Sequence, residues 1–203
     1  INHFNTFFIV TDDESHFRFL KILKNTNNKI FCEKPISRKK IELEHIKKFK
    51  LKNIFISDIS NYYPNINLKN RNYIYRSKID ADNSNNSKKR FDLLYRFLYH
   101  DIGYLLNKIK NIKIKKLKII NSKGHLELNF YIKDKFFNFK YVTNKKKTYT
   151  FNNKKIYSNK DNLKIMINDF LKNKFNSKKN LEKSFKISKI LEIIKLQMKK
   201  NSK

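Results

Sequence analysis

Two short stretches of the 203-residue sequence hold residues whose types could carry proton chemistry. The stretch FCEKPIS places Glu33 and Lys34 before a proline, and the stretch YHDIGYLL places His100 beside Asp101. A lysine serves in proton transfer when burial or a neighbouring cation lowers its pKa, and a histidine titrates close to neutral pH without such help. These two stretches therefore hold side chains of the types that act as general acids and bases.

Each of these residues also has a structural interpretation. Lys34 could be one more solvated lysine, and His100 could be a hydrogen-bonded histidine inside an apolar helix. Asp101 could orient a substrate hydroxyl or cap a polar edge. Pro35 has no N–H to give to a sheet, so it marks the end of a strand, and the sequence leaves open whether the bond before it is cis or trans.

The first sixty residues alternate short apolar runs with helical patterns. The runs cover residues 6–10, 29–33 and 53–57, and they have the continuous apolar character of strands buried on both faces. This order predicts a parallel sheet with right-handed crossovers, in which ligands bind beyond the carboxyl ends of the strands. The residues at those ends are Thr11 and Asp12, then Glu33, Lys34 and Pro35, and then Ser57 and Asp58.

Two helices are predicted to connect these strands. Asp12 and Asp13 are favourable N-cap residues for the first helix. Ser37 is the expected N-cap of the second helix, and Ile36 and Ile41 have the spacing of a hydrophobic staple across its first turn.

The alternation ends after Pro64. An apolar helix is followed by five short segments between residues 113 and 158 that are rich in aromatic and β-branched residues and separated by turn-like stretches such as NSKG. Residues 162–171 and 181–198 have the patterns of two closing helices. The second half therefore predicts an open antiparallel sheet with one solvated face, accompanied by helices.

The predicted fold class is α/β plus α+β. Residues 1–63 form the C-terminal part of a Rossmann-like parallel sheet, and residues 64–203 form the open antiparallel β-sheet domain with helices. The single cysteine cannot form an internal disulfide, and no apolar run approaches the roughly 20 residues that cross a bilayer. These features predict a cytoplasmic protein with no membrane partner.

The histidines and the cysteine predict no metal site. His3, His45 and His125 have no metal-ligand spacing with Cys32 or with one another. Cys32 has no sequence-local base, which favours packing in a strand over a role as nucleophile.

The net charge of +31 is typical of a nucleic-acid-binding protein. However, 42 of the 48 basic residues are Lys and the chain has only two Gly and two Pro, so a genome rich in A and T accounts for much of the charge. Nonspecific binding of nucleic acid is expected at low salt. A basic, ribosome-associated RNA-binding protein that combines Lys with Tyr and Phe remains an alternative function.

The stretch TDDESHFRFLKILKNTNNKIFCEKPIS resembles a segment of the Gfo/Idh/MocA family, which includes glucose-fructose oxidoreductase and inositol dehydrogenase. In that family a T-P-x-x-x-H turn leads through a helix to a strand ending in C-E-K-P. RFDLLYRFLYHDIGYLL is similar to the family's helix with a D-x-x-x-H pattern, and the last two helical stretches are similar to its closing helices. The resemblance covers nearly the whole chain and implies an NAD(P)-dependent oxidoreductase acting on a hydroxyl of a sugar, nucleotide sugar or polyol.

The resemblance also implies residue roles. Lys34 would hold the reacting hydroxyl and the nicotinamide ribose, and His100 would contact the substrate and transfer the proton. His16 belongs to the motif and is expected to hold the turn. A homo-oligomer through the open sheet is expected. The residues implied on the cofactor side are Thr11, Glu33, Lys34 and Pro35, and those on the substrate side are Arg96, His100 and Asp101.

Three departures from the family pattern qualify these roles. Asp12 stands where the family usually has proline, and Arg96 stands where it commonly has aspartate, the nearest acid being Asp92. The only glycines, Gly103 and Gly124, form no G-x-G-x-x-G phosphate loop. The chain is therefore expected to be a fragment of a longer protein or a degenerate form that binds NAD(P) poorly alone. A catalytically inactive interaction module is a further alternative.

Overall fold

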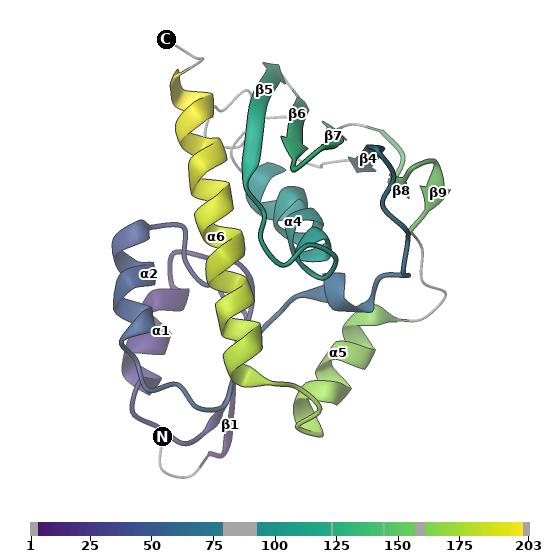
Figure 1. The fold of residues 1–203 in the computed structure, drawn as a ribbon. Coiled ribbons are helices and arrows are strands. Elements are labelled where there is room, and N and C mark those ends of the chain that lie inside the picture. The colour runs from purple at the N-terminus through teal and green to yellow at the C-terminus, as the bar shows by residue number, and fades with distance from the viewer. Residues whose placement is uncertain (1–3, 79–92, 123, 144, 157–160, 201–203) are drawn as a thin grey trace. The chain divides into compact units, whose positions relative to one another are not determined.

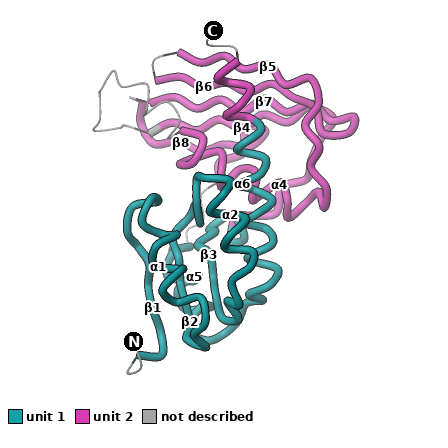
Figure 2. Tube along the Cα trace, turned by 90° about the vertical axis from the view of Figure 1, so that its left-hand side faces the viewer, with its two compact units in different colours: residues 1–62, 160–193 teal, residues 63–159, 194–203 magenta. Residues whose placement is uncertain are grey.

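The structure, a computed structural model, describes residues 4–78, 93–122, 124–143, 145–156 and 161–200. It contains two compact units (Figure 2). The chain leaves the first unit after Tyr62 and returns to it for the closing helices, so the first unit comprises residues 1–62 and 160–193 and the second comprises residues 63–159 and 194–203. The division of function between a cofactor domain and a substrate domain stays a prediction.

The first unit contains a parallel three-stranded sheet in the order β1–β2–β3 (Figure 2), and Figure 1 labels its edge strand β1. The register places Ile9 beside Cys32 and Cys32 beside Ile56 at the carboxyl ends. All three strands predicted from the apolar runs are confirmed, each one or two residues shorter than its run. The elements are β1 (Thr6–Ile9), α1 (His16–Leu23), β2 (Lys29–Cys32), α2 (Lys40–Lys47), β3 (Ile54–Ile56) and the 3-10 turn η1 (Ile59–Tyr62).

The prediction that Asp12 and Asp13 cap α1 is wrong, because the helix begins at His16. One carboxylate oxygen of Asp12 accepts hydrogen bonds from the backbone N–H groups of Glu14 and Ser15, both at 3.1 Å. Its other oxygen accepts from Oγ of Ser15 at 2.7 Å. Asp12 therefore closes an Asx turn before the helix, and such a turn can replace a proline at this position.

The predicted start of α2 is also wrong, since the helix begins at Lys40. Oγ of Ser37 accepts from the N–H of Lys39 at 3.0 Å and donates to the Glu42 carboxylate at 2.6 Å, so Ser37 stabilises the turn that precedes the helix. The hydrophobic staple does not form, because Ile36 is fully buried in the core whereas Ile41 is 66% exposed.

Both faces of the parallel sheet are covered. One face carries the aliphatic side chains of the strands and packs against α1, α2 and the part of α6 (Ser177–Lys200) that belongs to this unit. The other face carries Phe31 and Phe55, whose ring centroids lie 5.4 and 6.1 Å from that of Phe170 on α5 (Asn162–Leu171). The predicted helix at residues 162–171 matches α5, and the one predicted at 181–198 lies within α6.

Side chains of α6 occupy the outer edge of β3. Oγ of Ser177 accepts from the N–H of Ile54 at 3.0 Å and donates to its carbonyl at 2.7 Å. The amide of Asn180 pairs in the same way with the N–H and carbonyl of Ile56, at 2.6 and 3.0 Å. The backbone groups of this edge strand are thus satisfied by side chains rather than by another strand.

The second unit contains an open six-stranded sheet in the order β5–β6–β7–β4–β8–β9. The open sheet is confirmed, with one difference from the predicted antiparallel arrangement: β4 and β7 run parallel. A helix separates β4 from the β5–β6–β7 meander along the chain, so no hairpin fixes its direction. The strands are β4 (Arg71–Lys78), β5 (Ile114–Ser122), β6 (His125–Ile132), β7 (Lys135–Thr143), β8 (Thr148–Phe151) and β9 (Lys154–Lys155).

A helix covers one face of this sheet. The π-helical turn η2 (Leu94–Leu98) runs directly into α4 (Tyr99–Leu106). Ring contacts join this helical segment to the sheet, with centroid distances of 5.8 Å from Phe97 to Tyr141 and 5.7 Å from Tyr104 to Phe151. The beginning of the predicted helix lies outside the described residues. None of the helices in the described ranges is both long and apolar enough to cross a membrane.

Candidate functional site

The carboxyl ends of β1, β2 and β3 meet at one edge of the first unit, as the sequence predicted. The N–H of Glu33 donates to the carbonyl of Ile9 at 2.9 Å, and the N–H of Ser57 donates to the carbonyl of Cys32 at 2.8 Å. These bonds continue the ladder past the strand ends. The polar residues that follow the three strands are thereby held on the same edge, namely Thr11, Glu33, Lys34 and Asp58.

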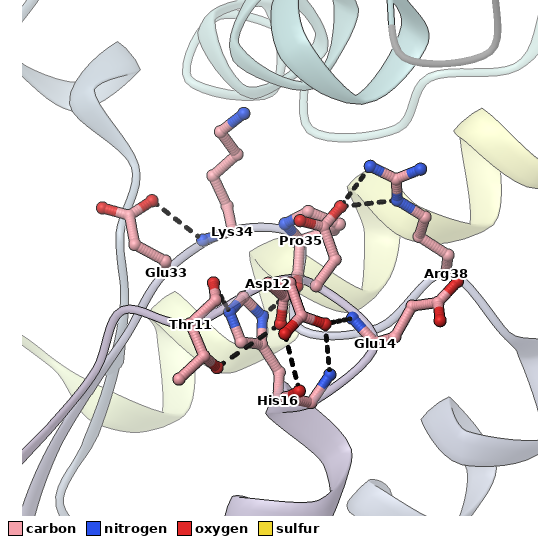
Figure 3. Close-up of polar contacts among 10 residues, drawn as sticks. Thr11, Asp12, Glu14, His16, Glu33, Lys34, Pro35 and Arg38 are labelled. Carbon is pink, nitrogen blue, oxygen red and sulfur yellow. Dashed lines mark hydrogen bonds and ion pairs between the residues drawn. The ribbon is translucent and has the colours of Figure 1, made fainter. Parts of the chain in front are cut away.

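His16 joins two of these strand ends. Its Nδ1 lies 2.8 Å from the carbonyl oxygen of Pro35 and its Nε2 lies 3.1 Å from that of Thr11 (Figure 3). The imidazole is completely buried, and both of its neighbours are carbonyl oxygens that only accept hydrogen bonds. The structure agrees with the expectation that His16 holds the turn.

The segment after β2 presents Lys34 at the sheet edge. The Lys34–Pro35 peptide bond is cis, and the N–H of Lys34 donates to a carboxylate oxygen of Glu33 at 3.2 Å. The Lys34 side chain is half-buried and points away from Glu33 and from His16 (Figure 3). Its position after a strand of the sheet is the one that a group contacting a bound ligand would need.

An ion pair that the sequence analysis missed stands after β3. Nζ of Lys183, from α6, lies 2.6 Å from Oδ2 of Asp58 and also donates to Ser60 Oγ at 3.2 Å and to Asn61 Oδ1 at 2.6 Å. Burial lowers the pKa of Lys183, and the charge of Asp58 opposes this effect. The three contacts use all three donors of the ammonium group, so Lys183 fixes the segment after β3 to α6.

His100 and Arg96 lie on the helical segment of the second unit. His100 is in the first turn of α4 and is 8% exposed, with its ring centroid 5.9 Å from that of Tyr99. Arg96 lies in η2 and is exposed. Asp92, the nearest acid before Arg96, lies outside the described residues.

Asp101 is fully buried at the centre of a polar network. Arg76 of β4 donates from Nη2 to Oδ1 at 2.6 Å and from Nε to Oδ2 at 3.0 Å. The hydroxyl of Tyr141 donates to Oδ2 at 2.8 Å, and that of Tyr149 donates to Oδ1 at 2.7 Å. The network ties α4 to three strands, β4, β7 and β8.

The pKa values of the side chains in this network are shifted mainly by burial and by the charge of Asp101. The guanidinium of Arg76 lies 3.5 Å from the ring centroid of Tyr149. Burial lowers the pKa of Arg76, but Asp101, Tyr149 and Tyr63 together outweigh burial, so this pKa lies above its ordinary value. Burial, and then Asp101, raise the pKa values of Tyr141 and Tyr149. Arg76 therefore stays charged and both phenols stay protonated through the neutral range.

The structure thus assembles two groups of the predicted residues. One group lies in the first unit and comprises Thr11, Glu33, Lys34 and Pro35; the other lies in the second unit and comprises Arg96, His100 and Asp101. Within the described ranges, no group of three or more His, Cys, Asp or Glu side chains could hold a metal ion.

Solved structures match the fold over nearly the whole chain, although no protein-family model and no curated protein match it. A Gfo/Idh/MocA family oxidoreductase from Vibrio cholerae matches with a TM-score of 0.72 and 10% sequence identity, covering 98% of this chain and 80% of that one. UDP-N-acetylglucosamine 3-dehydrogenase from Acidithiobacillus ferrooxidans matches with a TM-score of 0.73 and 10% identity, covering 92% and 76%.

A third match is the WlbA dehydrogenase from Thermus thermophilus, solved in complex with NAD and UDP-GlcNAcA. Its TM-score is 0.67 at 8% identity, and the match covers 92% of this chain and 71% of that one. The chain therefore has the fold of Gfo/Idh/MocA oxidoreductases over nearly its whole length. At these identities the likeness concerns the fold, and the activity has to be argued from this chain's own residues.

Proposed function

We propose that the chain belongs to an NAD(P)-dependent oxidoreductase that acts on a hydroxyl group of a sugar, nucleotide sugar or polyol. The observation that carries the proposal is the position of Lys34 beside the turn that His16 holds at the carboxyl edge of the parallel sheet. The fold shared with oxidoreductases supports the same class.

In this proposal two side chains handle the substrate's proton. Lys34 binds the reacting hydroxyl and stabilises the negative charge that develops on its oxygen, and His100 exchanges the proton. The nicotinamide cofactor, when bound, supplies the hydride acceptor or donor. Thr11, Glu33 and Pro35 fit the nicotinamide end of the cofactor, because they follow strands at the same end of the sheet as Lys34, where such ligands bind.

The residues of this chain do not fit the pyrophosphate of a dinucleotide. Gly103 lies inside α4, and Gly124, with φ of 67°, lies between β5 and β6. Neither glycine connects a parallel strand to a helix, which is where a phosphate loop must be. The proposed contacts are therefore limited to the nicotinamide end.

The substrate side is proposed on the helical segment of the second unit. The exposed Arg96 suits the diphosphate of a nucleotide sugar, since its guanidinium binds phosphate oxygens in pairs. His100 would contact the sugar. Asp101 already accepts from three side chains, so its contribution would be to hold α4 and with it His100.

Assembly is proposed through the outer face of the open sheet, whose inner face packs against α4. Tyr73 of β4 and Tyr131 of β6 are 45% and 37% exposed on it, and both contact the ring of Phe136, with centroid distances of 6.4 and 5.4 Å. This aromatic row crosses three neighbouring strands and would supply the apolar centre of a contact between two copies.

Binding of reduced nicotinamide mononucleotide tests the proposal, because this half-cofactor needs no pyrophosphate loop. The fluorescence of the nicotinamide should change saturably with the wild-type chain and with Lys40→Ala, an exposed lysine of the same unit. Lys34→Ala should weaken binding about tenfold or more. In a parallel assay with UDP-sugars and the oxidised form of this half-cofactor, which accepts the hydride from the sugar hydroxyl, Lys34→Ala and His100→Ala should each lower any turnover about a hundredfold. Equal binding by wild type and Lys34→Ala would remove Lys34 from the site.

A further inference from the structure

A hollow lies at the opposite edge of the first unit from Lys34. Its volume is about 580 Å³, and it is formed by the loop between α1 and β2 and the loop between α2 and β3. Both loops lead into the amino ends of their strands, so this hollow is separate from the carboxyl edge described above. Its lining residues are Lys24, Asn25, Asn27, Lys48, Phe49, Lys50 and Lys52.

The lining of the hollow is richer in lysine than the composition of the chain would predict. Four of the seven lining residues are lysines, whereas 42 lysines in 203 residues would place one or two there. Lys24 is half-buried and the other three are exposed. Throughout the described part of the chain, no ion pair joins any of the four to an acid. Glu44, the acid that Lys48 influences, is paired with Lys47 at 2.7 Å.

Helix ends account for only part of this charge. Lys24 and Lys48 are the C-cap residues of α1 and α2, where a cation offsets the partial negative charge of a helix end. Two such ends carry about one negative charge together. Four ammonium groups around the hollow therefore leave a surplus of about three positive charges, to which Lys50 and Lys52 contribute without any helix end to offset.

We propose that this hollow binds a compact oligophosphate group. Like charges that surround one hollow repel each other, and an anion with several charges relieves that repulsion most. Lysine binds phosphate as a point charge, and the amides of Asn25 and Asn27 can donate to the remaining oxygens. Phe49, half-buried and stacked on Phe17 at 6.1 Å, provides a wall for the organic part of a phosphate ester.

Thermal unfolding with inorganic tripolyphosphate tests this site on the full chain, at constant ionic strength set with sodium chloride. The pocket variant changes Lys24, Lys48, Lys50 and Lys52 to Gln. The control variant removes the same charge from exposed lysines of the same unit, Lys172, Lys178, Lys186 and Lys189. Tripolyphosphate should raise the unfolding temperature of wild type and control saturably, and the pocket variant should need about tenfold more ligand for the same shift.

Two outcomes of the tripolyphosphate experiment would overturn the site. One is an equal loss of affinity in the pocket and control variants, which would show that only the net charge matters. The other is stabilisation by tripolyphosphate that does not exceed that by sodium sulfate at equal ionic strength. If the pocket variant fails to fold in the absence of ligand, the double variant Lys50→Gln/Lys52→Gln replaces it, with Lys186→Gln/Lys189→Gln as its control.

A dodecameric single-stranded RNA serves as a second ligand for the same variants. If the pocket variant loses more affinity for this RNA than for tripolyphosphate, the hollow binds a polymer instead of a compact oligophosphate.

Discussion

Arg76 of β4 holds both carboxylate oxygens of Asp101 on α4, in an interior where Asp101 is fully buried and Arg76 is 8% exposed. The two residues are 25 positions apart in the sequence. Because a guanidinium can reach two oxygens at once, this pair fixes the rotation of α4 on the sheet as well as its position. His100 is the residue before Asp101, so the pair also determines where the candidate acid-base group points.

Asp101→Ala should lower the free energy of unfolding by about 3–5 kcal/mol, because it leaves the buried charge of Arg76 without a partner. Urea denaturation followed by circular dichroism measures the loss. Tyr149→Phe, which removes one hydrogen bond from the same carboxylate, should lose only about 1 kcal/mol. The double variant Arg76→Met/Asp101→Ala should be more stable than Asp101→Ala alone. If the double variant loses as much free energy of unfolding as the single variants Arg76→Met and Asp101→Ala added together, this account of the pair is contradicted.

His16→Ala should lower the free energy of unfolding by about 1–3 kcal/mol, because the buried carbonyl of Pro35 and the carbonyl of Thr11 would lose their partner. His45→Ala is the matched control, since His45 is exposed on α2 and its loss should change stability by less than about 0.5 kcal/mol. If both variants are equally stable, His16 does not hold the two strand ends together.

Alkaline pH should weaken the fold through the tyrosines. The structure raises the pKa values of Tyr62, Tyr104, Tyr141 and Tyr149 above the ordinary value of 10.0, and burial is the largest cause for each. In the unfolded chain these phenols lose protons that the folded chain keeps, so the stabilisation is complete below pH 10 and is lost as the pH rises above it. Ultraviolet titration should show at least four of the 11 tyrosines ionising late in the native protein and all together in urea.

The thiol of Cys32 should be unreactive in the folded protein. Cys32 is completely buried in β2, so a reagent cannot reach its sulfur in the folded chain. Burial also raises the pKa of the thiol, so the reactive thiolate does not form at neutral pH. Ellman's reagent should react with the native chain at least about a hundredfold more slowly than with the chain in urea. Ser122→Cys provides an exposed thiol on β5 as the control. Rapid labelling of the native wild type would mean that the parallel sheet opens readily.

The strands of the parallel sheet could be predicted from sequence because each is a continuous apolar run, the pattern expected where both faces are covered, as they are for β2 and β3. The starts of the two helices could not, because Asp12 and Ser37 use their side chains in turns that precede the helix, and capping and turn formation favour the same residue types. The spacing of Ile36 and Ile41 predicted a hydrophobic staple between them. Instead, Ile36 packs in the core of the unit and Ile41 is exposed to solvent, so the two side chains do not meet.

The partners of Asp101 were missed because they come from three separate strands, and no local pattern reports such a contact. One signal was present nonetheless. The chain has six arginines against 42 lysines, so an arginine retained in such a composition indicates a position where lysine cannot serve. Arg76, which holds two oxygens at once, is such a position. The same argument applies to Arg38, which pairs with Asp13 through two nitrogens.

Substitutions at the two outer edges of the parallel sheet should have opposite effects on association between copies of the chain. Asn180 replaces a neighbouring strand for Ile56 of β3, whereas β1, as far as the chain is described, pairs only with β2 and leaves Phe8 46% exposed. Asn180→Ala should cost about 1–3 kcal/mol and increase light scattering on partial unfolding, because it frees the backbone of an edge strand. Asn168→Ala, on the exposed side of α5, should change neither the stability nor the scattering.

Phe8→Lys should reduce scattering in the wild-type background, since a charge on the edge strand β1 opposes pairing between strands of different copies. Unchanged scattering in both Asn180→Ala and Phe8→Lys would show that neither edge governs association.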